Sequence, residues 1–309
     1  MNIVVRNVLL ATLFSLVSYS GAAAGLTRHT VMADGHPIAL WEKRAADAEE
    51  AILLVHGLTW SALPDFDLQV DGEQLSLMDG LVEQGYAVYA VDLRGYGSTP
   101  RDDTGWQTPN RAADDVAIAI DWIAAQQGWA IKPHLFGWSL GATISQLATQ
   151  RHPGKIASLT LFGYWRDDDV DLPPDPAGIE PAFVKNTAAA AASDFITPGS
   201  ISQKAIDAYV AMALDADPIK TDLKSYDQFN ALDASLIDTP TLVIQGEHDP
   251  IAPTAYQVKL YTRLGTGHKL WVTVPGGDHA AFMETPRAYF IHALVGFLQG
   301  VSRITLTAY

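Results

Sequence analysis

Short runs of apolar residues alternate along the chain with longer segments whose apolar residues recur at helical spacing. Ala51–Val55 is the clearest run, and it ends at His56. Such a run predicts a strand buried on both faces, and strands interleaved with helices predict an open, mostly parallel α/β sheet flanked by helices. Further strands are predicted at residues 86–91, 133–136, 156–162, 241–245 and 269–274, and helices at 74–84, 112–127, 140–150 and 286–298.

One segment interrupts this alternation. Residues 164–236 contain no convincing buried strand, but they include an alanine run at Ala188–Ala192 and short helical stretches such as residues 202–214. No Gly- or Ser-rich linker separates two domains. We therefore predict a helical cap at 164–236, inserted into one α/β core formed by residues 25–163 and 237–309.

The N-terminus has the order of a secretory signal. Arg6 supplies a positive charge, residues 8–17 are largely apolar, and Ala22-Ala23-Ala24 supplies the small residues of a cleavage site. A retained membrane anchor needs roughly 18 apolar residues, and this run is shorter. We predict a signal peptide at residues 1–24 and a periplasmic or secreted protein. No other stretch is expected to span a bilayer, so no stable membrane insertion is predicted after cleavage.

Composition narrows the classes of partner. The 309 residues carry a formal net charge of −15 and no cysteine. A phosphate backbone or an anionic membrane surface is best bound by positive charge, so neither is an expected partner. Disulfides, cysteine nucleophiles and thiolate metal sites are excluded together.

Gly137-Trp138-Ser139-Leu140-Gly141 fits the pattern G-x-S-x-G, and it lies between the strand predicted at 133–136 and the helix predicted from 140. A strand–turn–helix context is typical of a nucleophile elbow, which presents the serine hydroxyl above the edge of a sheet. A serine that caps a helix between packing glycines could give the same pattern. The motif therefore indicates a nucleophile only if a base and an acid are found elsewhere in the sequence.

A serine hydroxyl requires a base, and the base requires an orienting group. His279 lies in a Gly-rich loop directly after the last predicted strand, and we take it as the base. Asp249 follows the strand at 241–245 and is the expected acid, although it could be a plain turn residue before proline. Asp278 and Glu247 are the alternative acids.

An oxyanion is best stabilised by two fixed backbone N–H groups. The Leu140 N–H follows the nucleophile at the start of a helix, where the helix dipole helps. The second donor is expected in the loop after the first buried strand, at Leu58, with Thr59 as the alternative.

Taken together, these motifs resemble those of the α/β-hydrolase superfamily. The resemblance rests on Leu54-Val55-His56-Gly57, Asp92-Leu93-Arg94-Gly95-Tyr96-Gly97-Ser98, the elbow at 137–141, the acid loop at 246–253 and the histidine loop at 277–279. The order Ser, Asp, His is also that of this superfamily. It implies an eight-stranded, mostly parallel sheet with residues 164–236 as a cap over the site. A serine in the elbow argues against dehalogenase and epoxide hydrolase chemistry, and residues 60–74 remain unassigned.

We therefore predict an exported serine hydrolase that cleaves carboxylic esters through an acyl-enzyme, without metal or organic cofactor. The alternatives are a cofactor-free perhydrolase or haloperoxidase, a carbon–carbon bond hydrolase, an aminopeptidase, and a ligand-binding protein with slow turnover. Residues 166–180 carry one positive and six negative charges, so we expect a small, neutral and moderately apolar ester. The aromatic residues expected near the mouth of the site are Trp60, Trp106, Trp138, Tyr164 and Trp165, and all of them except Trp106 are assigned to the substrate pocket.

Overall fold

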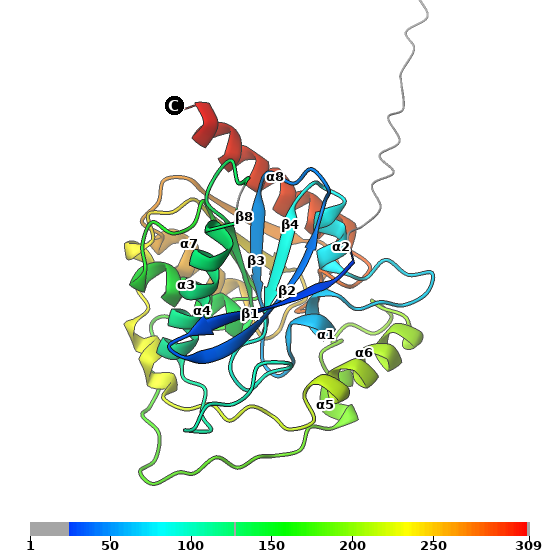
Figure 1. Cartoon of the computed structure of the whole chain (residues 1–309), viewed down its shortest axis with the longest axis vertical. Coiled ribbons are helices and arrows are strands. Elements are labelled where there is room, and N and C mark those ends of the chain that lie inside the picture. The colour runs from blue at the N-terminus through cyan, green and yellow to red at the C-terminus, as the bar shows by residue number, and fades with distance from the viewer. Residues whose placement is uncertain (1–24, 127, 308–309) are drawn as a thin grey trace, which may run out of the picture.

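The computed structural model describes residues 25–126 and 128–307, so the predicted signal peptide lies outside the described residues. An eight-stranded sheet with the order β1-β2-β4-β3-β5-β6-β7-β8 forms its centre (Figure 1). β1 and β2 pair antiparallel, β2 pairs antiparallel with β4, and the remaining pairs are parallel. The strands are β1 Thr27–Ala33, β2 His36–Arg44, β3 Ala51–Val55, β4 Ala87–Val91, β5 His134–Trp138, β6 Leu159–Phe162, β7 Thr241–Gly246 and β8 Lys269–Val274.

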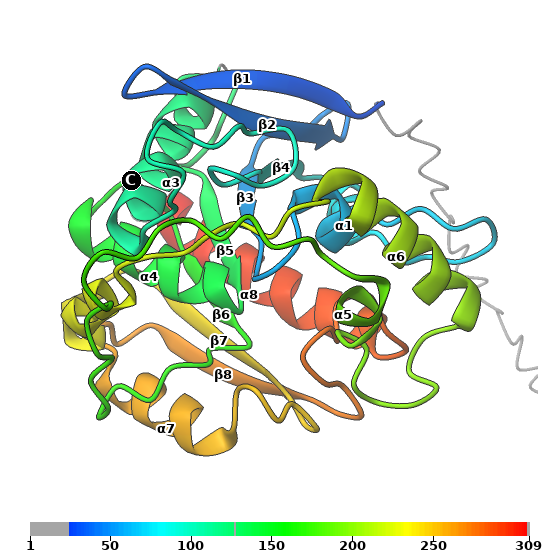
Figure 2. The same ribbon diagram turned by 90° about the horizontal axis from the view of Figure 1, so that it is seen from below.

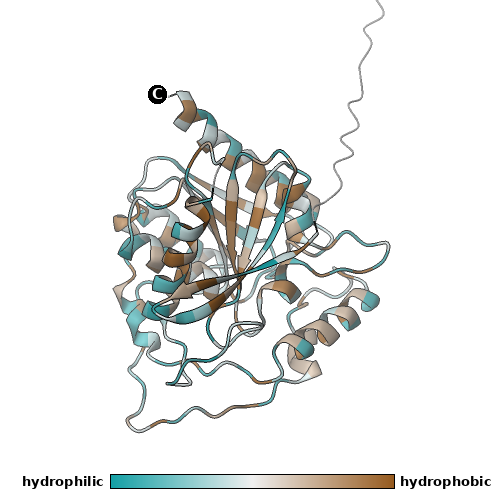
Figure 3. Cartoon of the chain, in the orientation of Figure 1, coloured by the Kyte–Doolittle hydropathy of each residue, from teal (hydrophilic) through white to brown (hydrophobic). Residues whose placement is uncertain are grey.

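Helices cover both faces of this sheet. Alternate strand residues point to opposite faces, so Leu54 and Phe136 belong to the apolar cluster under α2 and α8, while Leu53 and Leu135 belong to the cluster under α3 and α4. The central strands are accordingly apolar along their whole length (Figure 3). The helices are α1 Ala62–Phe66, α2 Leu77–Val82, α3 Pro109–Ala124, α4 Leu140–Arg151, α5 Ala188–Ala192, α6 Gln203–Ala216, α7 Thr254–Arg263 and α8 Arg287–Thr307, with 3-10 helices η1 Tyr226–Ala231 and η2 Ala234–Leu236.

The expected fold class is confirmed, and the differences are local. β3 and β8 have the predicted bounds, whereas the β1–β2 hairpin was not predicted. Its outer strand is largely exposed, so it lacks a continuous apolar run. Its turn is formed by Asp34 and Gly35, both with positive φ, and this Asp-Gly pair is the signal that could have identified it.

The expectation that no stretch after residue 24 is apolar enough to span a bilayer is wrong for α8. Arg287–Thr307 has the length and hydropathy of a membrane span. In the fold, however, Phe290, Leu294 and Leu298 are fully buried in the cluster against the sheet. The apolar face of α8 therefore belongs to the protein core.

The 164–236 segment crosses the end of the sheet at which the parallel strands finish (Figure 2). Regular helix is confined to α5, α6, η1 and η2, and long connections join them. Its acidic stretch is paired with α7, because Asp167 and Asp169 both contact Lys259, and Asp169 also contacts Arg263. Two of the six acidic residues that were expected to act on substrates are therefore already in ion pairs with α7.

Candidate active site

Ser139 occupies the sharp turn between β5 and α4. Its backbone adopts φ 55° and ψ −118°, a conformation that costs free energy in a residue with a Cβ. The Ser139 N–H donates to the Phe162 carbonyl at 2.9 Å, which ties the turn to β6. Backbone strain held in place by neighbouring structure is the arrangement expected of a nucleophile elbow.

The glycine after the elbow permits α4 to approach the sheet. At Gly141 a Cβ would overlap the backbone carbonyl oxygens of Val55 and His56, and no backbone atom can yield cheaply. Any larger residue would push α4 away from β3. The G-x-S-x-G pattern is therefore explained here by packing as well as by the turn.

His279 and Asp249 form a buried pair. The His279 Nδ1 lies 2.7 Å from Asp249 Oδ2, and the other carboxylate oxygen accepts from the N–H groups of Ile251 and Ala252 at 2.9 and 3.1 Å. Because the carboxylate has only acceptors to offer, the Nδ1–H of the neutral imidazole donates to it. The Nε2 is then left with a free lone pair, which is the form a general base requires.

The two alternative acids are bonded elsewhere. Glu247 is exposed and accepts from the Gly276 N–H at 2.8 Å. Asp278 is fully buried, but its carboxylate accepts from the N–H groups of Ala280 and Thr197 at 3.0 and 2.6 Å. Of the three candidates, Asp249 is the acid that contacts His279.

The histidine loop packs against the elbow. The Trp138 Nε1–H donates to the His279 carbonyl at 2.6 Å, and the two rings lie 5.6 Å apart between centroids. Gly163, with φ 63°, lies so close that a Cβ there would be 2.8 Å from His279 Cε1. Among the described residues Ser139 Oγ forms no hydrogen bond with His279; such bonds are often long in unliganded enzymes.

The expected oxyanion donors lie on both sides of Ser139. Leu140 opens α4, where a backbone N–H has no acceptor within the helix. A Cβ on Gly57 would lie 3.1 Å from Ser139 Cβ, so the oxyanion loop passes directly beside the serine. In the described part of the chain neither Leu58 N–H nor Thr59 N–H donates a hydrogen bond, and both stay available for this role.

Two buried side chains hold the oxyanion loop. His56 accepts from the Leu93 N–H at 3.1 Å, so its other nitrogen carries the hydrogen that is donated to the Gly57 carbonyl at 2.8 Å. Burial lowers the pKa of His56 to about 4, which keeps it neutral and structural. The Asp92 carboxylate accepts from the N–H groups of Ala62 and Ser98 at 3.0 and 2.9 Å.

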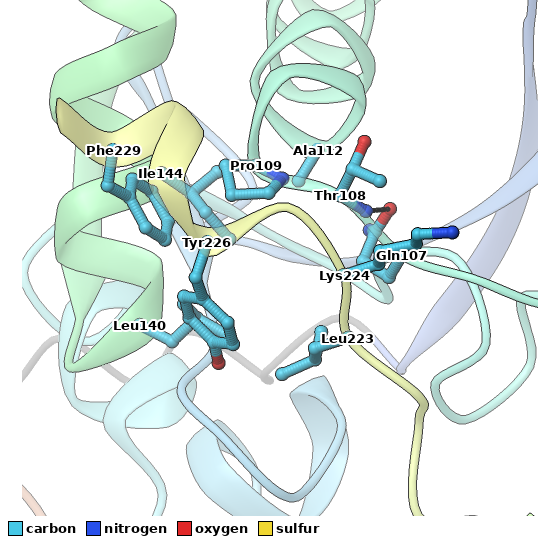
Figure 4. A pocket seen from close by; sticks show the side chains of 10 residues that line it. All are labelled: Gln107, Thr108, Pro109, Ala112, Leu140, Ile144, Leu223, Lys224, Tyr226 and Phe229. Atoms are coloured by element: carbon cyan, nitrogen blue, oxygen red, sulfur yellow. Dashed lines mark hydrogen bonds between the residues drawn. The ribbon is translucent and has the colours of Figure 1, made fainter. Parts of the chain in front are cut away.

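Two adjoining cavities begin beside the expected oxyanion donors. The smaller is a narrow crevice of about 10 Å³ and is lined by Leu140 of α4 and by Leu223 and Tyr226 (Figure 4). The larger, of about 350 Å³, shares Leu223 and Tyr226, begins at Leu58 and reaches Trp106. Most of the lining side chains are apolar. Lys224 also lines the smaller cavity, and Lys220 also lines the larger one.

The four aromatic residues expected in the pocket line neither of these cavities. Trp138 packs on His279, and Trp60 is buried beside Asp194. Tyr164 is buried and donates to Asp168 at 2.9 Å, while Trp165 packs on Tyr226 and Phe229. Their contact with substrate stays a prediction. Trp106 is the tryptophan that lines a described cavity.

One further carboxyl group lies near His279 and a second lies close to the first, and neither was identified from the sequence. Asp194 follows α5 and is close enough to His279 for the two charges to interact. Asp65 lies in α1, within the segment that the sequence left unassigned. No local motif marks either residue, because their proximity comes from tertiary packing. No cluster of His, Asp or Glu suited to a metal ion occurs within residues 25–126 and 128–307.

Sheet order, elbow and strand-end loops together define an α/β-hydrolase, and comparison with known proteins agrees. Residues 46–286 match the family described as serine aminopeptidase, S33, and the chain belongs to that family. A pimeloyl-[acyl-carrier protein] methyl ester esterase of Neisseria meningitidis is 28% identical over 276 residues, which cover 80% of this chain and 92% of that protein.

Two further similarities are more distant. A non-heme haloperoxidase of Rhodococcus erythropolis is 26% identical over 239 residues, covering 71% of this chain and 84% of that protein. The crystal structure of a serine hydrolase involved in carbazole degradation matches with a TM-score of 0.64 at 19% identity, covering 89% of this chain and 99% of that one. This last likeness concerns the fold alone. The protein is a hydrolase with an esterase-type α/β fold.

Proposed function

We propose that the protein cleaves small carboxylic esters through an acyl-enzyme intermediate. Ser139 attacks the ester carbonyl, and His279 accepts the serine proton and returns it to the leaving alcohol. Asp249 orients the imidazole and stabilises its charged form. The N–H groups of Leu140 and Leu58 bind the oxyanion. Water then repeats these steps on the acyl-enzyme and releases the acid.

The observation that carries this proposal is the pairing of His279 with Asp249 at 2.7 Å beside a strained serine. The three residues come from loops after β5, β7 and β8, which end at the same edge of the sheet. Relatives named as esterases support ester hydrolysis over the other reactions that this fold hosts.

The cavities support a moderately apolar substrate. Leu58 and Leu140 begin them, and Leu223 and Tyr226 continue them outward. Near the reacting carbonyl we propose that the substrate is neutral, because the Asp194 carboxyl lies close enough to His279 for their charges to interact and, when ionised, would repel an anion. Leu223 and Tyr226, which line both cavities, belong to the 164–236 segment, and we propose that this segment acts as the cap.

The test is a screen of p-nitrophenyl esters of increasing acyl length, with amino-acid p-nitroanilides and a peracid-forming assay alongside. Measurable kcat/KM for short to medium neutral acyl chains is the expected result. A matched ester with a carboxylate next to the carbonyl should react more slowly. Preferred turnover of the anilides would favour an aminopeptidase, and labelling of the serine without turnover would favour a binding protein.

We also propose that residues 1–24 are removed during export. The support is the charge, apolar run and Ala22-Ala23-Ala24 of this segment. Expression of the whole chain in a bacterium, followed by fractionation and mass measurement, tests the proposal. A periplasmic or extracellular protein that begins at Gly25 is expected, and an uncleaved cytosolic protein would contradict it.

A further inference from the structure

The hydroxyl of Tyr209 lies between two carboxyl groups. It is 2.9 Å from Asp65 Oδ1 and 3.0 Å from Asp194 Oδ2. Tyr209 belongs to α6, Asp65 to α1, and Asp194 follows α5, so three elements meet at one oxygen atom. Asp65 is 2% exposed and Tyr209 is fully buried.

Counting hydrogens shows that this cluster needs an extra proton. A phenol has one hydrogen to donate, and an ionised carboxylate has none. Tyr209 can donate to Asp65 or to Asp194, but not to both. The second short contact is favourable only if the other carboxyl is protonated and donates to the phenol oxygen. At least one carboxyl proton is therefore part of the folded arrangement.

The surroundings favour keeping that proton. Asp217 also acts on Asp65 electrostatically, while its own carboxylate accepts from the N–H groups of Ser61 and Gly97. The other groups that face the cluster are Tyr96, the Gly57 N–H, the Trp60 indole and His279, the last of which interacts with Asp194. No lysine or arginine is among these groups.

Burial is the main cause of the resulting pKa shifts. It raises the pKa of Asp65 well above its ordinary value and that of Asp194 to about 6. The Asp65 Oδ2 is buried without a hydrogen-bond partner among the described residues, as expected for a carboxyl that is not ionised. Since the sites interact, the proton belongs to the cluster rather than to one residue.

The cluster connects the 164–236 segment to both halves of the site. α1 follows the oxyanion loop that contains Leu58, and Asp194 lies beside His279. The Phe195 ring packs on Tyr209 at 5.0 Å between centroids, so Asp194 and α6 are fixed together. A change in the cluster therefore acts on the loop and on the histidine at once.

We propose that Asp65, Tyr209 and Asp194 are positioning residues that share a proton and hold the 164–236 segment against the oxyanion loop. The inference rests on the proposed function. When the shared proton is lost at alkaline pH, the negative charges of Asp65 and Asp194 face one buried phenol and repel each other. The segment then loosens from the oxyanion loop, and ester turnover falls.

The test compares the pH dependence of kcat/KM for a neutral ester in wild type and two variants. Asp194→Asn supplies the second hydrogen permanently through its amide, so it should keep neutral-pH activity within about threefold and lose the alkaline decline. Tyr209→Phe removes the bridge and should lower kcat/KM about tenfold, mainly through KM. Tyr89→Phe is the matched control, because Tyr89 is a buried tyrosine that donates to one carboxylate, Glu42, within the sheet.

Limited proteolysis gives a readout besides activity. In wild type, cleavage within 164–236 should increase between about pH 7 and about pH 9, and in Asp194→Asn this increase should be clearly smaller. The same alkaline decline in wild type and Asp194→Asn would overturn the inference, even if Tyr209→Phe fails to fold. The proposed function fails separately, by absence of ester turnover in wild type at every pH.

Discussion

The sheet core and the 164–236 segment are stabilised by different interactions. Leu54, Phe136 and Leu161 have no exposed surface, and their strands form continuous ladders between two apolar clusters. The segment has fewer buried apolar residues and is attached largely by polar contacts, such as those of Asp169 with α7 and of Tyr209 with Asp65. The core therefore depends on hydrophobic burial, and the segment depends on charge and protonation.

The core and the 164–236 segment also contribute different parts of the active site. Ser139, His279 and Asp249 lie on loops anchored in the core, while Leu223 and Tyr226 of the segment line the cavities. Changes in the core loops are expected to affect the chemical step. Changes in the segment are expected to affect substrate binding and pH dependence. The following predictions test that contrast.

The largest effect is expected for the acid in the core. Asp249→Asn should lower kcat by about 10⁴, because the imidazole loses the partner that fixes its tautomer. Asp278→Asn should be much milder, since Asp278 contacts backbone N–H groups instead of His279. Steady-state kinetics with a p-nitrophenyl ester measure both variants. The reverse ranking would show that the pairing of His279 with Asp249 is not the functional one.

Stability should distinguish the two regions. Phe136→Ala removes a fully buried ring that packs on Phe66 and Phe290, and it should cost about 3–5 kcal/mol of unfolding free energy. Lys259→Ala breaks ion pairs that are open to solvent and should change that free energy far less. Urea denaturation measures both. Equal losses would mean that the segment's ion pairs matter as much as the core.

A buried acid between the two regions should make stability depend on pH. Glu284 accepts from Ser200 Oγ of the segment at 2.7 Å, and burial beside Asp278 raises its pKa to about 8. A folded-state pKa above the ordinary value means that stability is lost as pH rises from about 4.5 to about 8.

Glu284→Gln should remove this loss. The unfolding free energy of the variant, relative to that of wild type, should therefore be about 1–3 kcal/mol higher at alkaline pH than at acidic pH. Urea denaturation at about pH 5 and about pH 8 measures the difference, with activity at neutral pH as the control for folding. If the free-energy gap between wild type and variant is the same at both pH values, Glu284 is not protonated in the folded state.

The sequence was most informative where burial leaves a periodic signal. A continuous apolar run located β3, β8 was located although it is only partly buried, and the loops that follow the strands contained Ser139, Asp249 and His279. The β1–β2 hairpin was missed because the exposed outer strand lacks such a run. Asp249 could be separated from Asp278 only once their hydrogen-bond partners were visible.

The contacts of the 164–236 segment could not be predicted in the same way. Asp65, Tyr209 and Asp194 come from three distant parts of the chain, and each has an ordinary local sequence. Their proximity depends on how α1, α5 and α6 pack, which no periodicity encodes. The same holds for the pairs between Asp169 and α7. Pairwise polar contacts between remote segments need the folded structure.

Labelling by a fluorophosphonate tests the central claim most directly, because the reagent bonds covalently to an activated serine. Mass spectrometry of wild type should find one label per chain, on the peptide that contains Ser139. Ser139→Ala should remain folded, take up no label and lose ester turnover. Full labelling of Ser139→Ala at another serine, or retained turnover in that variant, would contradict the account.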